Sequence, residues 1–328
     1  MQFAAAHAYP NIAFIKYWGN CEAEARIPAN GSISMNLDGL YSRTSVEFDS
    51  ALRVDELVLQ DEPGKGDTLE RVSAFLDIVR QLSSTNTYAH VDSKNNFPMG
   101  AGIASSASAF AALAVAASHA AGLDLTEKQL SQLARQGSGS ACRSIPSGFV
   151  EWQISECEAD SAAVSIAPPE HWPLVDHIAI VNQEHKLVGS TAGHDLAHTS
   201  ILQNSRVADA PRRLEICRRA ILQRDFESLA EIIELDCNLM HAVMMTSNPR
   251  LLYWEPTTLA VMERVKAWRA EGLLAAYTID AGPNVHVICE ASHQALIKER
   301  LGGISGVAQV ITAHPGGRAE LLSEMSPN

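Results

Sequence analysis

Residues 95–108 read Asn-Asn-Phe-Pro-Met-Gly-Ala-Gly-Ile-Ala-Ser-Ser-Ala-Ser, and no other stretch of the chain is as informative. Their small side chains leave the backbone N–H groups open to a ligand. The alanine-rich residues 109–118 follow directly and predict a helix. Unpaired N–H groups and the positive end of the helix dipole then meet at one point, which favours an anion such as a nucleotide phosphate. The alternative is a tight turn before a buried helix, where small residues only allow close packing.

The loop differs from the common phosphate-binding motifs. It lacks Gly-x-x-x-x-Gly-Lys-Ser/Thr, and it also lacks Gly-x-Gly-x-x-Gly, so a dinucleotide is a weak interpretation. Its spacing, Pro98-x-x-x-Gly102-Ile-x-Ser105-Ser106-x-Ser108, instead resembles the nucleotide loop of one kinase superfamily. That superfamily includes galactokinase, homoserine kinase, mevalonate kinase and phosphomevalonate kinase.

Length and composition narrow the classes of protein that fit. A chain of 328 residues can bury a large core in one big domain or two packed lobes. The 46% apolar and 19% charged content favours a folded chain throughout. With 38 acidic and 25 basic residues the net charge is −13, which argues against nucleic acid or an anionic membrane as a partner. An anionic substrate would need the few cations gathered locally.

The six cysteines and the N-terminus indicate a cytoplasmic protein. The cysteines are scattered, without Cys-x-x-Cys or a zinc spacing, so we expect buried reduced thiols. The opening Met-Gln-Phe-Ala-Ala-Ala-His lacks the basic region and apolar core of a signal peptide. Polar residues interrupt every apolar stretch before it reaches membrane-spanning length.

The apolar pattern predicts an α+β fold. A helix is expected from residue 69, with Asp67 or Thr68 as its N-cap, and another over 126–136, capped by Thr126. Further helices are expected at 105–121, between 190 and 270, and at 292–302. Strands are expected within 2–18 and 32–60 and near 90–93, 149–154, 176–182, 275–280, 286–289 and 307–312. We place a lobe boundary near residue 180, giving an N-terminal lobe of 1–180 with the nucleotide loop and a C-terminal lobe of 181–328.

Two further segments carry polar residues suited to ligand binding. Lys16 stands beside Tyr17 and Trp18 after an apolar run, and it could hold a nearby carboxylate ionised. The alternative is a strand end with a lysine reaching to solvent. The segment Gly137-Ser-Gly-Ser-Ala-Cys-Arg143-Ser offers hydroxyls and a guanidinium for a phosphate or carboxylate. The alternative there is a turn with a surface arginine.

A last segment, Thr278-Ile-Asp280-Ala-Gly-Pro-Asn, ends a predicted strand with an acid. Asp280 could act as a general base if it reached a hydroxyl within hydrogen-bond distance. A lone Asp before Gly-Pro also fits a turn or capping residue.

Taken together, these segments resemble the diphosphomevalonate decarboxylases, in the same order along nearly the whole chain. The strings Gly-Ser-Gly-Ser-Ala-Cys-Arg143 and Asp280-Ala-Gly-Pro-Asn are highly specific as a pair. Supporting matches are Asn11-Ile-Ala with Lys16-Tyr-Trp-Gly, Asn95-Asn-Phe-Pro with Ala104-Ser-Ser-Ala-Ser, and Gly148-Phe-Val-Glu-Trp. The resemblance implies the two-lobed fold of the kinase superfamily with a deep active-site cleft, ATP and Mg²⁺ as cosubstrates, and a homodimer.

The resemblance also implies a role for each matching residue. Asp280 is implied as the catalytic carboxylate, Lys16 as its electrostatic partner, and Arg143 as the residue nearest the substrate carboxylate. The nucleotide loop would comprise Pro98, Gly100, Gly102, Ala104, Ser105, Ser106 and Ser108, with Ser105 and Ser106 near a magnesium ion on the ATP phosphates. The phosphorylated mevalonate would contact Tyr17, Asn20, Ser138, Gly139, Ser140, Arg143, Ser190, His194 and Ala281.

Two positions depart from the family pattern. The family commonly carries Lys or Arg after Tyr-Trp-Gly, where this chain has Asn20 followed by Cys21 and Glu22, and it usually has Met where this chain has His194. The missing cation predicts mevalonate 5-phosphate as substrate, converted to isopentenyl phosphate, CO₂, ADP and phosphate. If His194, His185 or Lys186 replaces the charge, the substrate is instead mevalonate 5-diphosphate.

Two other functions fit the same segments less well. A mevalonate 3-kinase would phosphorylate and stop, but Asp280, Lys16 and Arg143 together favour decarboxylation. A binding or sensor protein without activity would not need all four segments intact.

Overall fold

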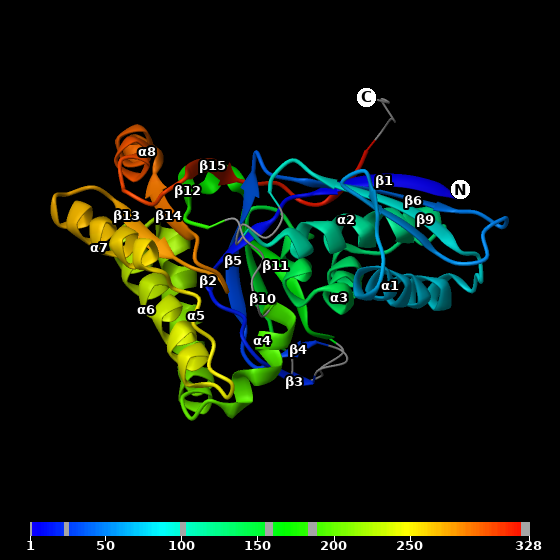
Figure 1. Cartoon of the computed structure of the whole chain (residues 1–328), viewed down its shortest axis with the longest axis horizontal. Helices are drawn as coiled ribbons and strands as arrows, with labels where there is room; N and C mark the ends of the chain where they lie inside the picture. Colours follow the sequence, from blue (N-terminus) through cyan, green and yellow to red (C-terminus); the bar gives the residue numbers. More distant parts are fainter. Residues whose placement is uncertain (1, 23–25, 99–102, 155–159, 183–188, 323–328) are drawn as a thin grey trace.

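The computed structural model describes residues 2–22, 26–98, 103–154, 160–182 and 189–322. It is a mixed α/β structure, in which one sheet carries helices α1, α2 and α3 and a second sheet carries helices α5, α6 and α7 (Figure 1). The α+β prediction is confirmed. Among the described residues, no helix is both long enough and apolar enough to span a bilayer.

The first sheet holds the nucleotide-loop segment against its helices. Its strand order is β16 (Glu320–Leu321), β1 (Phe3–Ala8), β6 (Ser42–Phe48), β9 (Ala89–Asn95), β7 (Glu56–Leu59) and β8 (Glu62–Pro63). Helices α1 (Asp67–Ser83), α2 (Ser105–Ala120) and α3 (Glu127–Gly137) pack together beneath it (Figure 1).

Helix α2 lies directly on β1 and β6, and its alanines explain how it can. Twelve of its residues are buried, among them a continuous run from Phe110 to Ser118. Small side chains on every face let the helix sit between a sheet and two other helices. A Cβ on Gly137 would come within 2.0 Å of the Phe110 ring, so α3 must end in glycine where it meets α2.

The second sheet joins distant parts of the chain. Its order is β11 (Ala162–Ala167), β10 (Phe149–Gln153), β5 (Ser32–Asp38), β15 (Gln309–Pro315), β12 (Leu174–Ile180), β14 (Val285–Glu290) and β13 (Ala275–Thr278), and β2 (Asn11–Ile15) also pairs with β5. Helices α5 (Gln203–Gln223), α6 (Phe226–Thr246) and α7 (Pro256–Ala270) lie beside it, and α8 (Gln294–Gly302) packs on β12 and β15 (Figure 1).

Shorter elements complete the chain near the site. They are the hairpin β3 (Asn20–Glu22) with β4 (Ile27–Pro28), the 3-10 turn η1 (Gly139–Ser144), helix α4 (Ser190–Leu196), and the 3-10 turns η3 (Pro169–His171), η4 (Ala197–Thr199) and η5 (Ala291–His293). Because β15 pairs with β5 and β12, and β16 pairs with β1, the end of the chain returns to the N-terminal half. The division into lobes at residue 180 stays a prediction.

Local sequence signals set some of the helix boundaries. Thr126 caps α3 as predicted: its hydroxyl accepts from the Gln129 N–H, and the Gln129 side chain accepts from the Thr126 N–H. The predicted cap of α1 at Asp67 or Thr68 is wrong. Gly66 holds that position with a φ of 57°, which glycine adopts without strain, so the helix already includes Asp67.

Candidate active site

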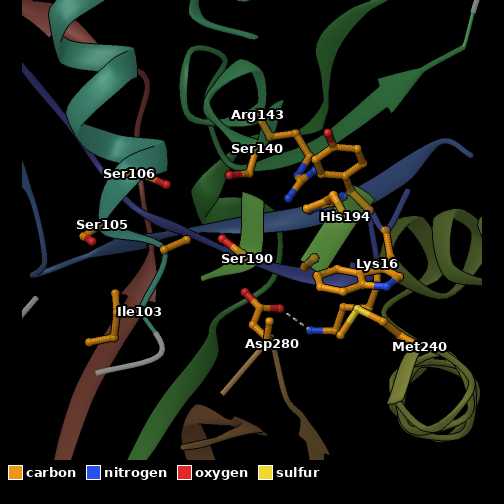
Figure 2. A pocket seen from close by; sticks show the side chains of 15 residues that line it. Lys16, Ile103, Ser105, Ser106, Ser140, Arg143, Ser190, His194, Met240 and Asp280 are labelled. Atoms are coloured by element: carbon orange, nitrogen blue, oxygen red, sulfur yellow. Dashed lines mark hydrogen bonds and ion pairs between the residues drawn. The ribbon is translucent and has the colours of Figure 1, made fainter. Parts of the chain in front are cut away.

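A cavity of about 170 Å³ brings together residues from every predicted segment. Figure 2 shows their side chains arranged around a common space, with Asp280 on one side and Arg143 and Ser140 on the other. The lining comprises Ala13, Lys16, Tyr17, Trp18, Ile103, Ala104, Ser105, Ser106, Ser140, Arg143, Ser190, His194, Met240, Asp280 and Ala281. Segments far apart in sequence therefore share one site.

The centre of the site is an ion pair between Lys16 and Asp280. Lys16 Nζ lies 2.7 Å from Asp280 Oδ1, and the lysine is 1% exposed whereas the aspartate is 27% exposed toward the cavity. Burial alone would raise the pKa of Asp280, but the charge and hydrogen bond of Lys16, with contributions from His286 and Arg143, outweigh it and lower the pKa below its ordinary value. Asp280 is thus an ionised carboxylate that faces a ligand space.

Lys16 is fixed in place through its backbone. Its N–H donates to Asp236 Oδ2 at 2.6 Å, and its carbonyl accepts from Arg206 at 2.6 Å and from Asn30 at 3.0 Å. Asp236 also accepts from Arg213 Nε at 2.7 Å, and both of these side chains are fully buried. Because strand β2 ends at Ile15, this network determines where the next side chain points.

Arg143 keeps its charge without a carboxylate bond. Its guanidinium donates to Ser34 Oγ at 3.0 Å, to Ser32 Oγ at 2.7 Å and to Asn11 Oδ1 at 3.0 Å. All three acceptors are neutral, and burial lowers the pKa of Arg143, with the negative charge of Asp280 opposing that shift. The guanidinium is held rigidly and still has charge to offer to an anion in the cavity.

The N-terminus of α2 forms another wall of the cavity. Ala104, Ser105 and Ser106 line it, and the N-cap residue Ala104 has no side-chain group that could cap the helix. Ser106 Oγ lies 3.2 Å from Ser138 Oγ, which connects the loop to the Gly-Ser-Gly-Ser segment. An uncapped helix start with hydroxyls beside it suits an anion.

Two of the predicted loop residues, Ser108 and Pro98, are placed away from the cavities at this helix. The Ser108 side chain is buried, its hydroxyl lies 2.6 Å from Ser42 Oγ, and it lines neither cavity at this helix, so it supports the loop from behind. Pro98 is exposed and also lines neither of them. Gly100 and Gly102 lie outside the described residues.

A second cavity of about 290 Å³ adjoins the first at Ser105 and Ser106. Its walls are mainly apolar and include Leu57, Phe110 and Leu113. It has the size of a pocket for a flat ring system, next to a helix start that can take phosphates.

Aromatic rings form the side of the first cavity beyond Arg143. The Tyr17 ring lies 4.1 Å from the His194 ring, which also stacks on Trp18 at 4.5 Å between centroids. The Gly19 N–H donates to His194 Nδ1 at 3.0 Å, and burial lowers the pKa of His194 to about 3. His194 is therefore neutral at pH 7, and its remaining proton lies on Nε2.

Of the other predicted substrate residues, two line the first cavity and two lie behind or beside it. Ser190 and Ala281 line the first cavity. Gly139 packs on Tyr17, because a Cβ there would lie 2.5 Å from the ring. Asn20 accepts from the Tyr17 hydroxyl and lines a neighbouring cavity instead. Asn20 thus acts on the site through Tyr17.

Comparison with known proteins identifies the family. A family described as diphosphomevalonate decarboxylase-like N-terminal domain matches residues 8–163, and one described as mevalonate 5-diphosphate decarboxylase C-terminal domain matches residues 177–320. A diphosphomevalonate decarboxylase of Ganoderma lucidum is 39% identical over 315 residues, 88% of this chain and 79% of the relative. The chain belongs to the diphosphomevalonate decarboxylase family.

Solved structures agree with this membership. Mevalonate diphosphate decarboxylase from Staphylococcus aureus is 36% identical, with a TM-score of 0.93 over 98% of each chain. A structure described as MDDEF in complex with MVAPP, AMPPCP and magnesium is 37% identical, with a TM-score of 0.92 over 98% of this chain and 99% of that one. The resemblance read from the four segments is confirmed, and so is the fold.

Sequence reasoning missed several residues of this decarboxylase-family site. Arg71 lines the second cavity. In the sequence it looks like half of an exposed ion pair on a helix, because Asp67 stands four residues earlier. Asp236 and Glu234 are acids set among the apolar Ile232, Ile233, Leu235 and Cys237, and a charge within an apolar stretch was the signal that could have found Asp236.

The network behind Lys16 gives the first prediction. In Asp236→Asn the amide can still accept from the Lys16 N–H, but Arg213 loses its fully buried charge partner and keeps only the more exposed Asp209, so we expect a loss of about 3–5 kcal/mol in the free energy of unfolding. Urea denaturation measures it. The control is Asp209→Asn, which removes the half-exposed partner of the same arginine and should cost less than about 1 kcal/mol. Equal losses in the two variants would contradict the prediction.

The ion pair gives the second prediction. Lys16→Met removes the nearest positive charge while burial remains, so the pKa of Asp280 should rise. In the wild type the carboxylate stays ionised until the pH falls through its lowered pKa, and in the variant protonation should begin at higher pH. Carbon-13 NMR of carboxyl-labelled aspartate measures this without needing activity. Lys266→Met, which removes a lysine facing the Tyr277 ring, should leave the Asp280 titration unchanged.

Proposed function

We propose that the protein decarboxylates mevalonate 5-diphosphate with ATP, giving isopentenyl diphosphate, CO₂, ADP and phosphate. The observation that carries the proposal is the ionised Asp280, paired with Lys16, facing the buried Arg143 across a cavity that adjoins the helix start at Ser105 and Ser106. A carboxylate, a guanidinium and an anion-binding helix end are the parts this reaction requires.

The chemistry assigns each part a task. Hydroxide on a tertiary carbon is a poor leaving group, so the 3-hydroxyl must first become a phosphate ester. Asp280 would orient or deprotonate that hydroxyl as it attacks the terminal phosphorus of ATP and ADP departs. The new phosphate then leaves with the C–O electron pair, and CO₂ leaves as the C–C electrons form the double bond. Arg143 would hold the carboxylate in the plane from which CO₂ departs.

The two cavities fit ATP as the second substrate. Its ring system would occupy the apolar cavity beside Phe110, and its phosphates would reach the uncapped start of α2. Ser105 and Ser106 offer hydroxyl oxygens for Mg²⁺, which commonly takes few protein ligands and binds largely through phosphates and water. When bound, Mg²⁺ neutralises negative charge on the phosphates.

The sequence and the comparisons indicate different lengths for the phosphate chain of the mevalonate substrate. Asn20 removes an expected cation and predicts the 5-phosphate. The relatives described above are named for the diphosphate, and the MDDEF complex contains MVAPP, AMPPCP and magnesium. These comparisons support the diphosphate, which the sequence analysis held as the alternative. The 5-phosphate remains the second candidate because Asn20 contacts Tyr17 with no charge to offer.

Turnover with each substrate is the third prediction. We expect CO₂ and ADP in equal amounts and a higher kcat/KM for mevalonate 5-diphosphate than for the 5-phosphate. Asp280→Asn should lower kcat by about 10²–10⁴-fold because a general base is lost. The control is Asp195→Asn, an exposed acid on α4 that does not line this cavity. ADP without CO₂ would indicate a 3-kinase, and a preference for the 5-phosphate would favour the second candidate.

Two serines of α2 give the fourth prediction. Ser106→Ala removes a hydroxyl from the wall between the cavities and should raise KM for ATP by about 5–10-fold, the loss of one hydrogen bond to a charged group. Ser108→Ala is the matched control, since its buried hydroxyl contacts Ser42 and should cost about 1 kcal/mol of stability with KM for ATP unchanged. If both variants raise KM alike, the loop does not bind the nucleotide as proposed.

A further inference from the structure

We propose that Arg26 binds the terminal phosphate of the 5-diphosphate and so supplies the charge that Asn20 lacks. This inference rests on the function proposed above, and it assigns a specificity-determining residue to the same site. Arg26 lies outside every segment singled out in the sequence.

The hairpin of β3 and β4 determines where Arg26 lies. Asn20 pairs with Pro28 and Glu22 pairs with Ile27, so the chain turns back and brings Arg26 beside the segment that contains Tyr17. Arg26 Nε donates to the Gln136 carbonyl at 3.1 Å, at the C-terminal end of α3. Arg26 therefore reaches the start of the Gly-Ser-Gly-Ser segment from the hairpin.

A second guanidinium, that of Arg71, hydrogen-bonds to the next backbone carbonyl along the chain. Arg71 donates to the Gly137 carbonyl twice, from Nε at 3.0 Å and from an Nη at 2.7 Å. Burial, together with the nearby positive charge of Arg26, lowers the pKa of Arg71 to about 10. Two like charges are thus held side by side on successive carbonyls.

Neither arginine has an acidic partner within the part of the chain that the structure describes. Among the described residues, no carboxylate lies within 4.0 Å of either guanidinium. Holding two cations together without a counter-charge costs free energy unless a ligand provides the anion. A diphosphate has oxygens enough on two phosphorus atoms for both guanidiniums.

The carbonyls lead directly into the substrate cavity. After Gly137 the chain continues to Ser138, which contacts Ser106, and to Gly139, which packs on Tyr17. The charge of Arg26 is felt there, since after burial it is the largest influence lowering the pKa of His194. Arg26 is partly exposed and lies on a surface hairpin, so the phosphate farthest from the reacting carbon would meet it.

The test compares both substrates in Arg26→Gln and Arg26→Lys. We expect Arg26→Gln to lower kcat/KM for mevalonate 5-diphosphate by about 10–100-fold, mainly through KM, as for a lost charged hydrogen bond. For the 5-phosphate the change should stay within about 3-fold of wild type, and Arg26→Lys should fall between. Asn20→Lys in the Arg26→Gln background should restore much of the loss. Arg264→Gln, an exposed arginine on α7, is the charge-matched control and should behave as wild type.

Other outcomes separate the inference from the proposed function. Wild-type protein inactive on both substrates would refute the function itself. If Arg26→Gln were as active as wild type on the diphosphate, or lost activity equally on both substrates, the role of Arg26 would be overturned. The proposed function would still stand. Thermal unfolding of each variant, expected to match wild type, excludes misfolding as the cause. Inhibition by inorganic pyrophosphate should weaken in Arg26→Gln and not in Arg264→Gln.

Discussion

The ion pair of Lys16 and Asp280 connects residues 264 positions apart and fixes the chemistry of the site. A buried positive charge is costly unless an opposite charge lies close to it, and Lys16 is only 1% exposed. Asp280 supplies that opposite charge and in return stays ionised in a partly buried position. Each group makes the other's charged state possible, so the strand end after β2 and the strand end after β13 must meet for either to function.

The rest of the site is arranged around this pair by neutral or compensated contacts. Arg143 is held by hydroxyls and an amide, and so it keeps its full charge for a ligand. Asp236 and Arg213 neutralise each other while holding the backbone of Lys16. The small residues of α2 let its N-terminal end approach this centre, which places a helix N-terminus in the same cavity as the ionised Asp280. Arg143 and the N-terminal end of α2 therefore keep positive charge without a counter-charge, and the negative charge of a phosphorylated substrate would balance it.

The sequence revealed the parts of this arrangement that depend on local signals. Thr126 and Gln129 form a cap whose geometry is set within four residues, and the small-residue loop before α2 is visible without any tertiary information. The Asp-Ala-Gly-Pro-Asn and Gly-Ser-Gly-Ser-Ala-Cys-Arg strings pointed to Asp280 and Arg143. The predicted N-cap of α1 was wrong because the residue at that position, Gly66, has a positive φ, which favours glycine over a polar capping residue.

Residues whose role depends on long-range contacts could not be predicted. Ser108 has the spacing of a ligand residue, yet helix geometry turns it toward Ser42. Arg26 and Arg71 meet only because the β3–β4 hairpin and α1 converge on the end of α3. From the sequence, His194, His185 and Lys186 were the candidates to replace the charge missing at Asn20. His185 and Lys186 lie outside the described residues, and the approach of Arg26 to this region depends on the folded hairpin.

The most direct test of the account is a crystal structure of the protein with mevalonate 5-diphosphate and a non-hydrolysable ATP analogue. The quantity to measure is the distance from the substrate 3-hydroxyl oxygen to the Asp280 carboxylate. The account predicts a hydrogen bond of about 2.6–3.2 Å, with the terminal phosphate of the analogue at the start of α2 facing that oxygen. A 3-hydroxyl directed away from Asp280, or a nucleotide bound elsewhere, would contradict it.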